Sequence, residues 1–164
     1  MFIFFALSCL LATAAAQISE NCLNCICQVE GCQSQIGKCR MDVGSLSCGP
    51  FQIKEPYWID CGRPGGDWKS CTTQMACSRT CVRSYMTRYG TYCTGGRAPT
   101  CQDYARIHNG GPRGCQSSST VGYWKKVQQC CASSPGGCGL DHEVLRYGAV
   151  DIEEDTVYRQ AEDV

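Results

Sequence analysis

The chain has 164 residues, no formal net charge at pH 7 and 17 cysteines. This length suits one compact domain with appendages, and so many cysteines favour a disulfide-stapled secreted protein over one from a reducing compartment. The basic residues are not accompanied by any nucleic-acid-binding motif, and no apolar run after residue 16 is long enough to span a bilayer. We therefore expect neither a nucleic-acid partner nor a membrane span.

The first 16 residues have the pattern of a secretory signal peptide. Met1 precedes a short apolar run that ends in Ala14, Ala15 and Ala16, small residues typical of a cleavage site. Cleavage before Gln17 would remove Cys9 and leave 16 cysteines, an even number that predicts up to eight disulfides of unknown pairing. The expected disulfide cysteines are Cys22, Cys25, Cys27, Cys32, Cys39, Cys48, Cys61, Cys71, Cys77, Cys81, Cys93, Cys101, Cys115, Cys130, Cys131 and Cys138.

Cys22, Cys25 and Cys27 also have a spacing that resembles zinc-ligand motifs. Zinc-bound thiolates would require a reducing compartment, which the signal peptide argues against. We expect no metal and no cofactor.

The zero net charge hides two parts of opposite sign. Residues 17–131 carry 13 Lys and Arg against 7 Asp and Glu, whereas residues 132–164 carry 2 Arg against 8 Asp and Glu. A basic secreted domain suits an anionic polymer as partner, such as a bacterial wall. Residues 132–164 begin with a Ser, Pro and Gly linker composition, and we expect a disordered acidic tail after it.

The first elements expected in chain order are a helix and a small sheet. Hydrophobic spacing predicts a helix over residues 19–31, capped by Ser19 or Asn21 and ended by Gly31, with Glu30 closing its apolar face. Alternation predicts a strand over residues 39–43 with Asp42 on its polar face. Residues 44–49 have a turn composition, and a second strand is expected over residues 51–54.

The rest of the domain is predicted to be helical after a loop at residues 61–70. Helices are expected over residues 71–89, 100–108 and 120–131, the second with a capping box formed by Thr100 and Asp103. Cys131 and Cys138 are close enough in sequence to close a small local loop. The fold class is therefore α+β, a small disulfide-rich domain with several short helices and a small antiparallel sheet.

Two carboxyl groups in contrasting surroundings can hydrolyse a glycosidic bond. One donates a proton to the leaving oxygen, and the other stabilises or captures the sugar cation. Glu30, on an apolar helix face, is the candidate acid, and Asp42, on a polar strand face, is the candidate partner. The pair is weak evidence by itself, because a Glu and an Asp at such a separation occur in most proteins.

Longer segments carry a resemblance to a known family. The chain closely resembles the invertebrate-type lysozymes, and most nearly their destabilase-like members from annelids, in the segments CLNCICQVEGC, MDVGSLSCGPFQIKEPYWIDCGRPGG, CQDYARIHNGGPRGC and TVGYWKKVQ. The resemblance covers about residues 20–131 and implies a lysozyme-like domain over residues 17–131. It also implies cleavage of the β-1,4 bond between N-acetylmuramic acid and N-acetylglucosamine in bacterial peptidoglycan. Glu30 would be the acid and Asp42 the second carboxylate, and we favour a retaining mechanism.

Several other residues are candidates for a sugar-binding groove. Lys54 follows Asp42 on the neighbouring strand, and aromatic side chains such as Tyr57 offer flat faces to sugars. Trp58 fits the groove and the core equally well. The remaining candidates are Tyr85, Tyr89 and, placed at the ligand site by the resemblance, His108, Asn109 and Gly110.

Two further functions remain open. Some relatives are credited with splitting isopeptide bonds between Glu and Lys side chains, which requires an activated nucleophile such as Ser45 with His108, or less readily with Lys54. Gln74 stands where the leech relatives have a lysine, which weakens that alternative. The scaffold could also be a non-enzymatic wall-binding antimicrobial protein. We expect a secreted enzyme of defence or digestion that is a monomer or a weak dimer.

Overall fold

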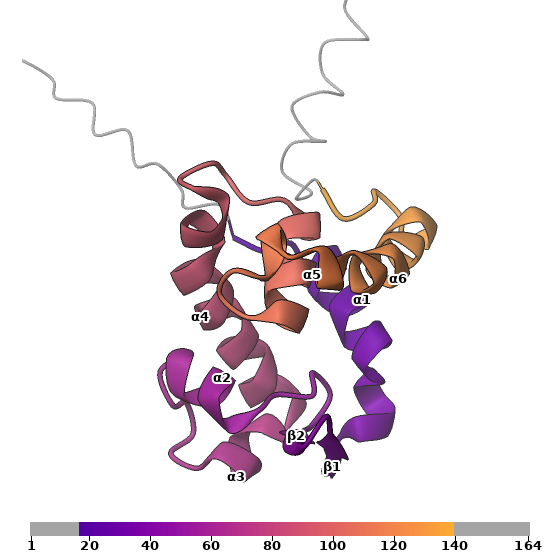
Figure 1. Ribbon diagram of the computed structural model, residues 1–164. Helices are drawn as coiled ribbons and strands as arrows, with labels where there is room; N and C mark the ends of the chain where they lie inside the picture. Colours follow the sequence, from indigo (N-terminus) through magenta and orange to yellow (C-terminus); the bar gives the residue numbers. More distant parts are fainter. Residues whose placement is uncertain (1–16, 140–164) are drawn as a thin grey trace, which may run out of the picture.

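The structure, a computed structural model, describes residues 17–139. The expected signal peptide and residues 140–164 of the expected tail lie outside the described residues. In Figure 1, helix α4 (Met75–Thr94) runs along the molecule and joins its two halves. One half contains the strands β1 (Cys39–Asp42) and β2 (Ser45–Cys48) and the helices α2 (Glu55–Asp60) and α3 (Trp68–Thr72). The other half contains α1 (Glu20–Glu30), α5 (Cys101–Gly110) and α6 (Val121–Ser133).

Three 3-10 turns complete the secondary structure of the described residues: η1 (Cys32–Gln35), η2 (Gly114–Gln116) and η3 (Ser118–Thr120). The expected α+β class, with short helices and a small antiparallel sheet, is confirmed. None of the helices within residues 17–139 is long and apolar enough to cross a membrane.

The predicted first helix is confirmed as α1, with both of its boundary signals. The Ser19 side chain accepts a hydrogen bond from the backbone N–H of Cys22 at 3.2 Å, and Gly31 ends the helix with φ 101°. Leu23 and Ile26 are fully buried, so the apolar face anchors the helix in the core. Glu30, the last helical residue, is thereby held where the apolar face ends.

The sheet contains one predicted strand and one that was predicted wrongly. β1 matches the expected strand, but its partner is β2, inside the segment expected to be a turn, with Asp42 opposite Ser45. The turn is confined to Val43 and Gly44, which both have positive φ, as a tight hairpin requires. Ile53 forms only an isolated bridge with Cys48. The Ser and Gly composition of residues 44–49 is typical of a turn, and β2 forms there because it pairs with β1.

The middle of the chain is more helical than predicted. α2 is not among the predicted helices, and α3 begins inside the expected loop, where the Asp67 side chain accepts a hydrogen bond from the N–H of Ser70 at 2.8 Å. The helix predicted over residues 71–89 is divided at Thr73 and Gln74 into α3 and α4. The helices expected over residues 100–108 and 120–131 are confirmed as α5 and α6, as is the capping box of α5.

All 16 cysteines of the described chain form disulfides, as the even count predicted. Cys22, Cys25 and Cys27 belong to three different bridges, so their thiolates are not available to zinc. The predicted local loop is closed by Cys131 and Cys138. The eight pairs are Cys22–Cys101, Cys25–Cys130, Cys27–Cys32, Cys39–Cys48, Cys61–Cys81, Cys71–Cys77, Cys93–Cys115 and Cys131–Cys138.

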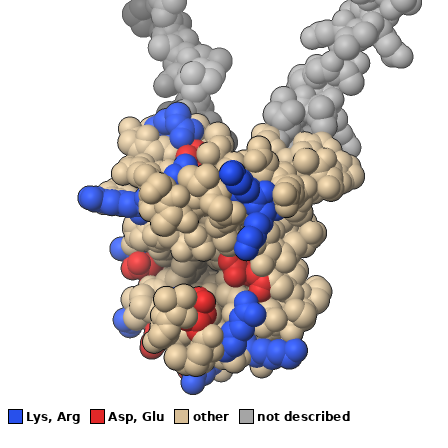
Figure 2. All heavy atoms as spheres, turned by 45° about the vertical axis from the view of Figure 1, so that its right-hand side comes forward, with Lys and Arg blue, Asp and Glu red and all other residues tan. Residues whose placement is uncertain are grey.

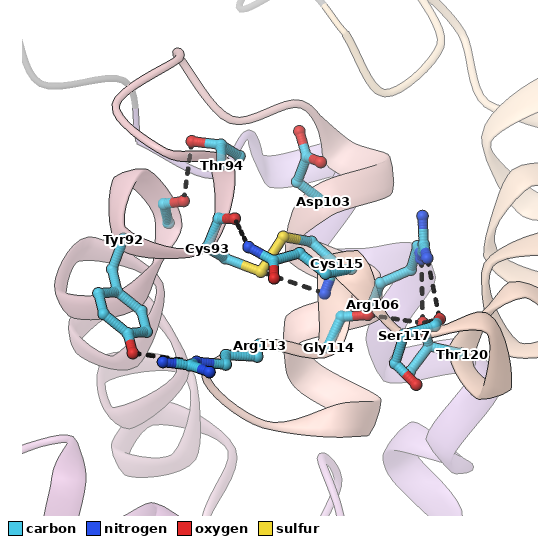
Figure 3. The surroundings of a disulfide bond; sticks show 12 residues. Tyr92, Cys93, Thr94, Asp103, Arg106, Arg113, Gly114, Cys115, Ser117 and Thr120 are labelled. Atoms are coloured by element: carbon cyan, nitrogen blue, oxygen red, sulfur yellow. Dashed lines mark hydrogen bonds between the residues drawn. A yellow bond between two sulfur atoms is a disulfide. The ribbon is translucent and has the colours of Figure 1, made fainter.

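One disulfide fixes the segment between α5 and α6. The Cys93–Cys115 bridge joins the end of α4 to this segment, and Arg113 Nε donates a hydrogen bond to the hydroxyl of Tyr92 at 3.2 Å (Figure 3). Gly111 begins the segment and lines the cavity described below. The bridge therefore stabilises one wall of the functional site.

Candidate active site

A cavity of about 260 Å³ lies between the two halves of the molecule and contains both predicted carboxyl groups. Glu30 reaches it from the end of α1, and Asp42 from the end of β1. Figure 2 shows a hollow in the middle of the molecular surface, with acidic atoms at its margin and basic side chains beyond them. The cavity is lined by Glu30, Asp42, Gln52, Lys54, Pro56, Tyr57, Tyr85, His108, Asn109 and Gly111.

The two carboxyl groups have contrasting surroundings. The side chain of Glu30 is 17% exposed, whereas that of Asp42 is 53% exposed. The Glu30 Oε1 atom lies 3.7 Å from His108 Nε2, beyond the distance of a normal hydrogen bond. A largely buried carboxyl and a solvated one therefore face the same cavity.

Asp42 is held by Lys54. The ammonium nitrogen lies 3.3 Å from Asp42 Oδ2 and donates a hydrogen bond to the backbone carbonyl of Asp42 at 2.8 Å. The same nitrogen lies 2.5 Å from Ser45 Oγ. Three contacts with the hairpin give Lys54 a fixed position, and its charge faces the Asp42 carboxylate.

His108 is neutral and fixed by two hydrogen bonds. Its Nε2 lies 3.1 Å from the carbonyl of Phe51, which can only accept, so Nε2 carries the hydrogen. Its Nδ1, 3.2 Å from the Tyr57 hydroxyl, is then the acceptor. Burial lowers the pKa of His108, although the charge of Glu30 and the Phe51 carbonyl oppose this effect. His108 is therefore a structural support of the cavity, with both ring nitrogens occupied.

Two stacked tyrosines, Tyr57 and Tyr85, form another part of the cavity lining. The rings of Tyr57 and Tyr85 lie 3.6 Å apart between centroids and are tilted by only 11°, and Tyr89 stands against Tyr85 with centroids 4.7 Å apart. Burial is the main cause that raises the pKa of Tyr57 and Tyr85 well above the usual range. Both phenols keep their protons near neutral pH, so this wall is uncharged and aromatic. Tyr89 lies next to the cavity and is not part of its lining.

The structure separates some residues that the sequence grouped together. Ser45 lines a neighbouring cavity of about 330 Å³ together with Lys54, and no contact joins it to His108 within residues 17–139. Trp58 is buried and donates a hydrogen bond from Nε1 to the Pro64 carbonyl at 3.0 Å, which makes it a core residue. Gly110 lies outside the lining of the active-site cavity.

Four residues near the site were not among the predicted site residues: Gln52, Pro56 and Gly111 line the cavity, and Tyr123 lies beside it. Arg40 Nε donates a hydrogen bond to Gln52 Oε1 at 2.6 Å. Gln52 could have been predicted, because it shares a side with the candidate Lys54 in the alternating segment 51–54. Pro56 stands in the first turn of α2, where proline is favoured. Tyr123 comes from α6, and nothing in the sequence connects it with Glu30.

Two carboxyl groups that share an open cavity and differ in exposure are the arrangement of a two-carboxylate glycoside hydrolase. The sequence model of the Destabilase family matches residues 19–130. The invertebrate-type lysozyme of Ruditapes philippinarum is 56% identical over 119 residues, which cover 71% of this chain and 84% of that protein. The lysozyme of Meretrix lusoria is 54% identical over 117 residues, which cover 71% and 93% of the two chains.

Solved structures agree with the sequence comparisons. The crystal structure of Tapes japonica lysozyme matches with a TM-score of 0.64 and 51% identity, over 75% of this chain and 95% of that one. The Meretrix lusoria lysozyme in complex with Aeromonas hydrophila PliI matches with a TM-score of 0.63 and 52% identity, over 71% and 93%. The chain belongs to the Destabilase family, the family of the invertebrate-type lysozymes.

Proposed function

We propose that the protein is a secreted lysozyme that hydrolyses the β-1,4 bond between N-acetylmuramic acid and N-acetylglucosamine in bacterial peptidoglycan. The observation that carries this proposal is the single cavity shared by Glu30 and Asp42. Relatives named lysozyme, about half identical over nearly their whole length, support the same reaction. The basic domain suits an anionic wall, and eight disulfides suit an extracellular setting.

In the proposed reaction, Glu30 is the general acid and Asp42 the nucleophile. Glu30 transfers its carboxyl proton to the glycosidic oxygen as the bond from that oxygen to C1 breaks. The Asp42 carboxylate forms a new bond to C1, and Lys54 holds this carboxylate through Oδ2, which leaves Oδ1 for the attack. Water then attacks C1 and gives a proton to Glu30 as the bond from C1 to Asp42 breaks, which restores the Asp42 carboxylate, so the products keep the β configuration.

The products identify the bond that is cut. Peptidoglycan fragments made by the oxidised protein should carry a new reducing end on N-acetylmuramic acid, which borohydride reduction and mass spectrometry reveal. Reducing ends on N-acetylglucosamine only, or no new reducing ends, would contradict the proposal. The first anomer of a soluble oligosaccharide product, followed by NMR, should be β; an α product would show inversion and remove Asp42 from the role of nucleophile.

An isopeptidase is a second candidate, and it depends on the contact between Ser45 Oγ and Lys54 Nζ at 2.5 Å. A serine needs a base to take its proton, and Lys54 is paired with Asp42 as an ammonium ion. A Glu–Lys isopeptide substrate tests this activity. Cleavage that Ser45→Ala abolishes would establish it as an additional function, whereas the absence of cleavage by the wild type would exclude it.

A non-enzymatic wall-binding role makes a different prediction. If the basic surface alone kills bacteria, killing should be unchanged in Glu30→Gln, because this substitution leaves the surface basic residues in place. We expect killing of lysozyme-sensitive cells to decrease together with hydrolysis.

A further inference from the structure

Tyr123 is a half-buried residue beside the proposed active site. Its ring lies next to that of His108, with centroids 6.3 Å apart. Its hydroxyl oxygen is buried and makes no hydrogen bond of normal geometry with any residue of the described chain. Buried polar groups are nearly always paired, because an unpaired one loses its bonds to water without compensation. An unpaired hydroxyl at this position therefore calls for a functional explanation.

The antiparallel packing of α1 and α6 brings Tyr123 to Glu30. At the start of α1, Asn21 donates hydrogen bonds to carbonyl groups just after the end of α6. One turn later, Cys25 is bonded to Cys130. With a rise of about 1.5 Å per residue, Glu30 lies about 7.5 Å beyond this bridge along α1, and Tyr123 about 10.5 Å along α6 in the same direction. The two residues therefore lie within one helical turn of the same level of the helix pair.

The pKa of Tyr123 agrees with a position close to Glu30. The pKa of Tyr123 is raised well above its usual range, first by burial, then by the charge of Glu30 and by a hydrogen-bonding interaction with the Glu30 side chain, with a smaller contribution from Tyr57. The phenol therefore keeps its proton throughout the working pH range. It can donate a hydrogen bond but cannot act as an acid.

The other groups that face Glu30 are already engaged. From α5, the Nε2–H of His108 is directed to the Phe51 carbonyl, and from α2 the Tyr57 hydroxyl donates to His108. The charged groups of Asp42 and Lys54, which also line the cavity, are paired with each other. The Tyr123 hydroxyl is a buried donor that interacts with the Glu30 side chain but makes no hydrogen bond of normal geometry within residues 17–139.

We propose that Tyr123 is a positioning residue for proton donation: when Glu30 has given its proton to the leaving sugar oxygen, the Tyr123 hydroxyl donates a hydrogen bond to the carboxylate that remains. The proton moves from Glu30 to the glycosidic oxygen, and the O–H bond of Tyr123 stays intact. Charge develops on Glu30 only as the bond breaks, so a donor fixed in advance stabilises the transition state more than the bound substrate. This inference rests on the proposed function.

The first test is the pH–rate profile of Tyr123→Phe on a soluble chitooligosaccharide. We expect kcat to fall about tenfold with little change in KM. The alkaline limb, where Glu30 loses its proton, should move up by about one pH unit, because the charged carboxylate loses a stabilising donor. The acid limb should stay in place. Tyr104→Phe, at a buried tyrosine that lines a different cavity, is the matched control and should leave both limbs unchanged. An unmoved alkaline limb in Tyr123→Phe would overturn the inference.

A second measurement does not need catalysis. In protein labelled with ¹³C at glutamate carboxyl and tyrosine ring carbons, the Tyr123 Cζ resonance of the wild type should shift at the pH where the Glu30 carboxyl titrates, with Glu30→Gln and Tyr123→Phe used for assignment. A Tyr123 resonance that stays constant through this titration refutes the hydrogen bond, even if Tyr123→Phe does not fold. Should the wild type fail to cut peptidoglycan while these resonances move together, the proposed function fails and the hydrogen bond stands.

Discussion

Replacing Cys25 and Cys130 together by alanine opens the bridge between α1 and α6, the helices that carry Glu30 and Tyr123. The two cysteines are 105 residues apart in sequence, but the Cys22–Cys101 bridge shortens the path between them. The loop that the Cys25–Cys130 bridge closes contains about 32 residues, which corresponds to about 3.7 kcal/mol of lost unfolded-chain entropy. This loss is a large fraction of a typical domain stability of about 5–15 kcal/mol.

The matched control is the double variant Cys131→Ala with Cys138→Ala. This bridge spans 7 residues at the end of α6, and the same relation assigns it about 2.4 kcal/mol. Guanidinium unfolding of both variants and the wild type, with all other bridges oxidised, gives the two differences directly. The control should keep most of its activity, whereas the Cys25 and Cys130 variant should lose activity as α1 and α6 separate near Glu30.

Loop length does not determine the stabilisation if both variants lose the same free energy of unfolding, or if the loss of the short Cys131–Cys138 bridge lowers it more. Full activity of the Cys25 and Cys130 variant, at a temperature where it remains folded despite the expected destabilisation, would show that the α1–α6 contact does not position Glu30.

Three further predictions concern single side chains. Lys54→Met should lower kcat/KM about tenfold, because Asp42 loses its positioning contacts, while the melting temperature stays nearly constant, since exposed ion pairs contribute little to stability; initial rates and thermal melts test this. Asp103→Asn should lower the free energy of unfolding by about 1 kcal/mol at pH 7. Burial raises the pKa of Asp103, but hydrogen bonds from Thr100 and Arg97 outweigh it, so the net pKa is lowered. The difference in stability between wild type and variant should therefore vanish when unfolding is measured well below pH 3.8, where Asp103 is protonated in both states. The pKa of His108 is lowered by burial, so the unfolded chain binds its proton first, and wild-type stability should fall as the pH drops below about 6.5; His108→Gln should flatten that slope in melts at a series of pH values.

Local signals in the sequence predicted much of the fold. α1 could be located because Ser19, the apolar spacing and Gly31 all act within one helix. The capping box of Thr100 and Asp103 did the same for α5. β2 could not be predicted in this way, because Ser45 and Ser47 have low strand propensity and are held by pairing with β1. Apart from the local Cys131–Cys138 pair, disulfide pairing was beyond prediction, since it depends on how the folded chain packs.

The residues of the site also differ in whether local sequence signals could identify them. Glu30 and Asp42 could be proposed from helix and strand periodicity together with family motifs, and the structure places both in one cavity. The Ser45 and His108 pair was proposed from residue types alone. In the structure, Ser45 Oγ contacts Lys54 Nζ and His108 Nδ1 contacts the Tyr57 hydroxyl. Tyr123 was out of reach because its approach to Glu30 depends on the register of α1 against α6, which only the folded chain defines.

The most direct test of the proposed function compares the clearing of a peptidoglycan suspension by the wild type, Glu30→Gln and Glu20→Gln. Glutamine keeps the shape of Glu30 but cannot donate a carboxyl proton. Glu20 is a matched carboxylate at the other end of the same helix, where it pairs with Arg79 and Arg83. We expect clearing by the wild type and Glu20→Gln, and a loss of at least about 100-fold in Glu30→Gln. Equal clearing by all three proteins would show that Glu30 is not the acid and would contradict the account.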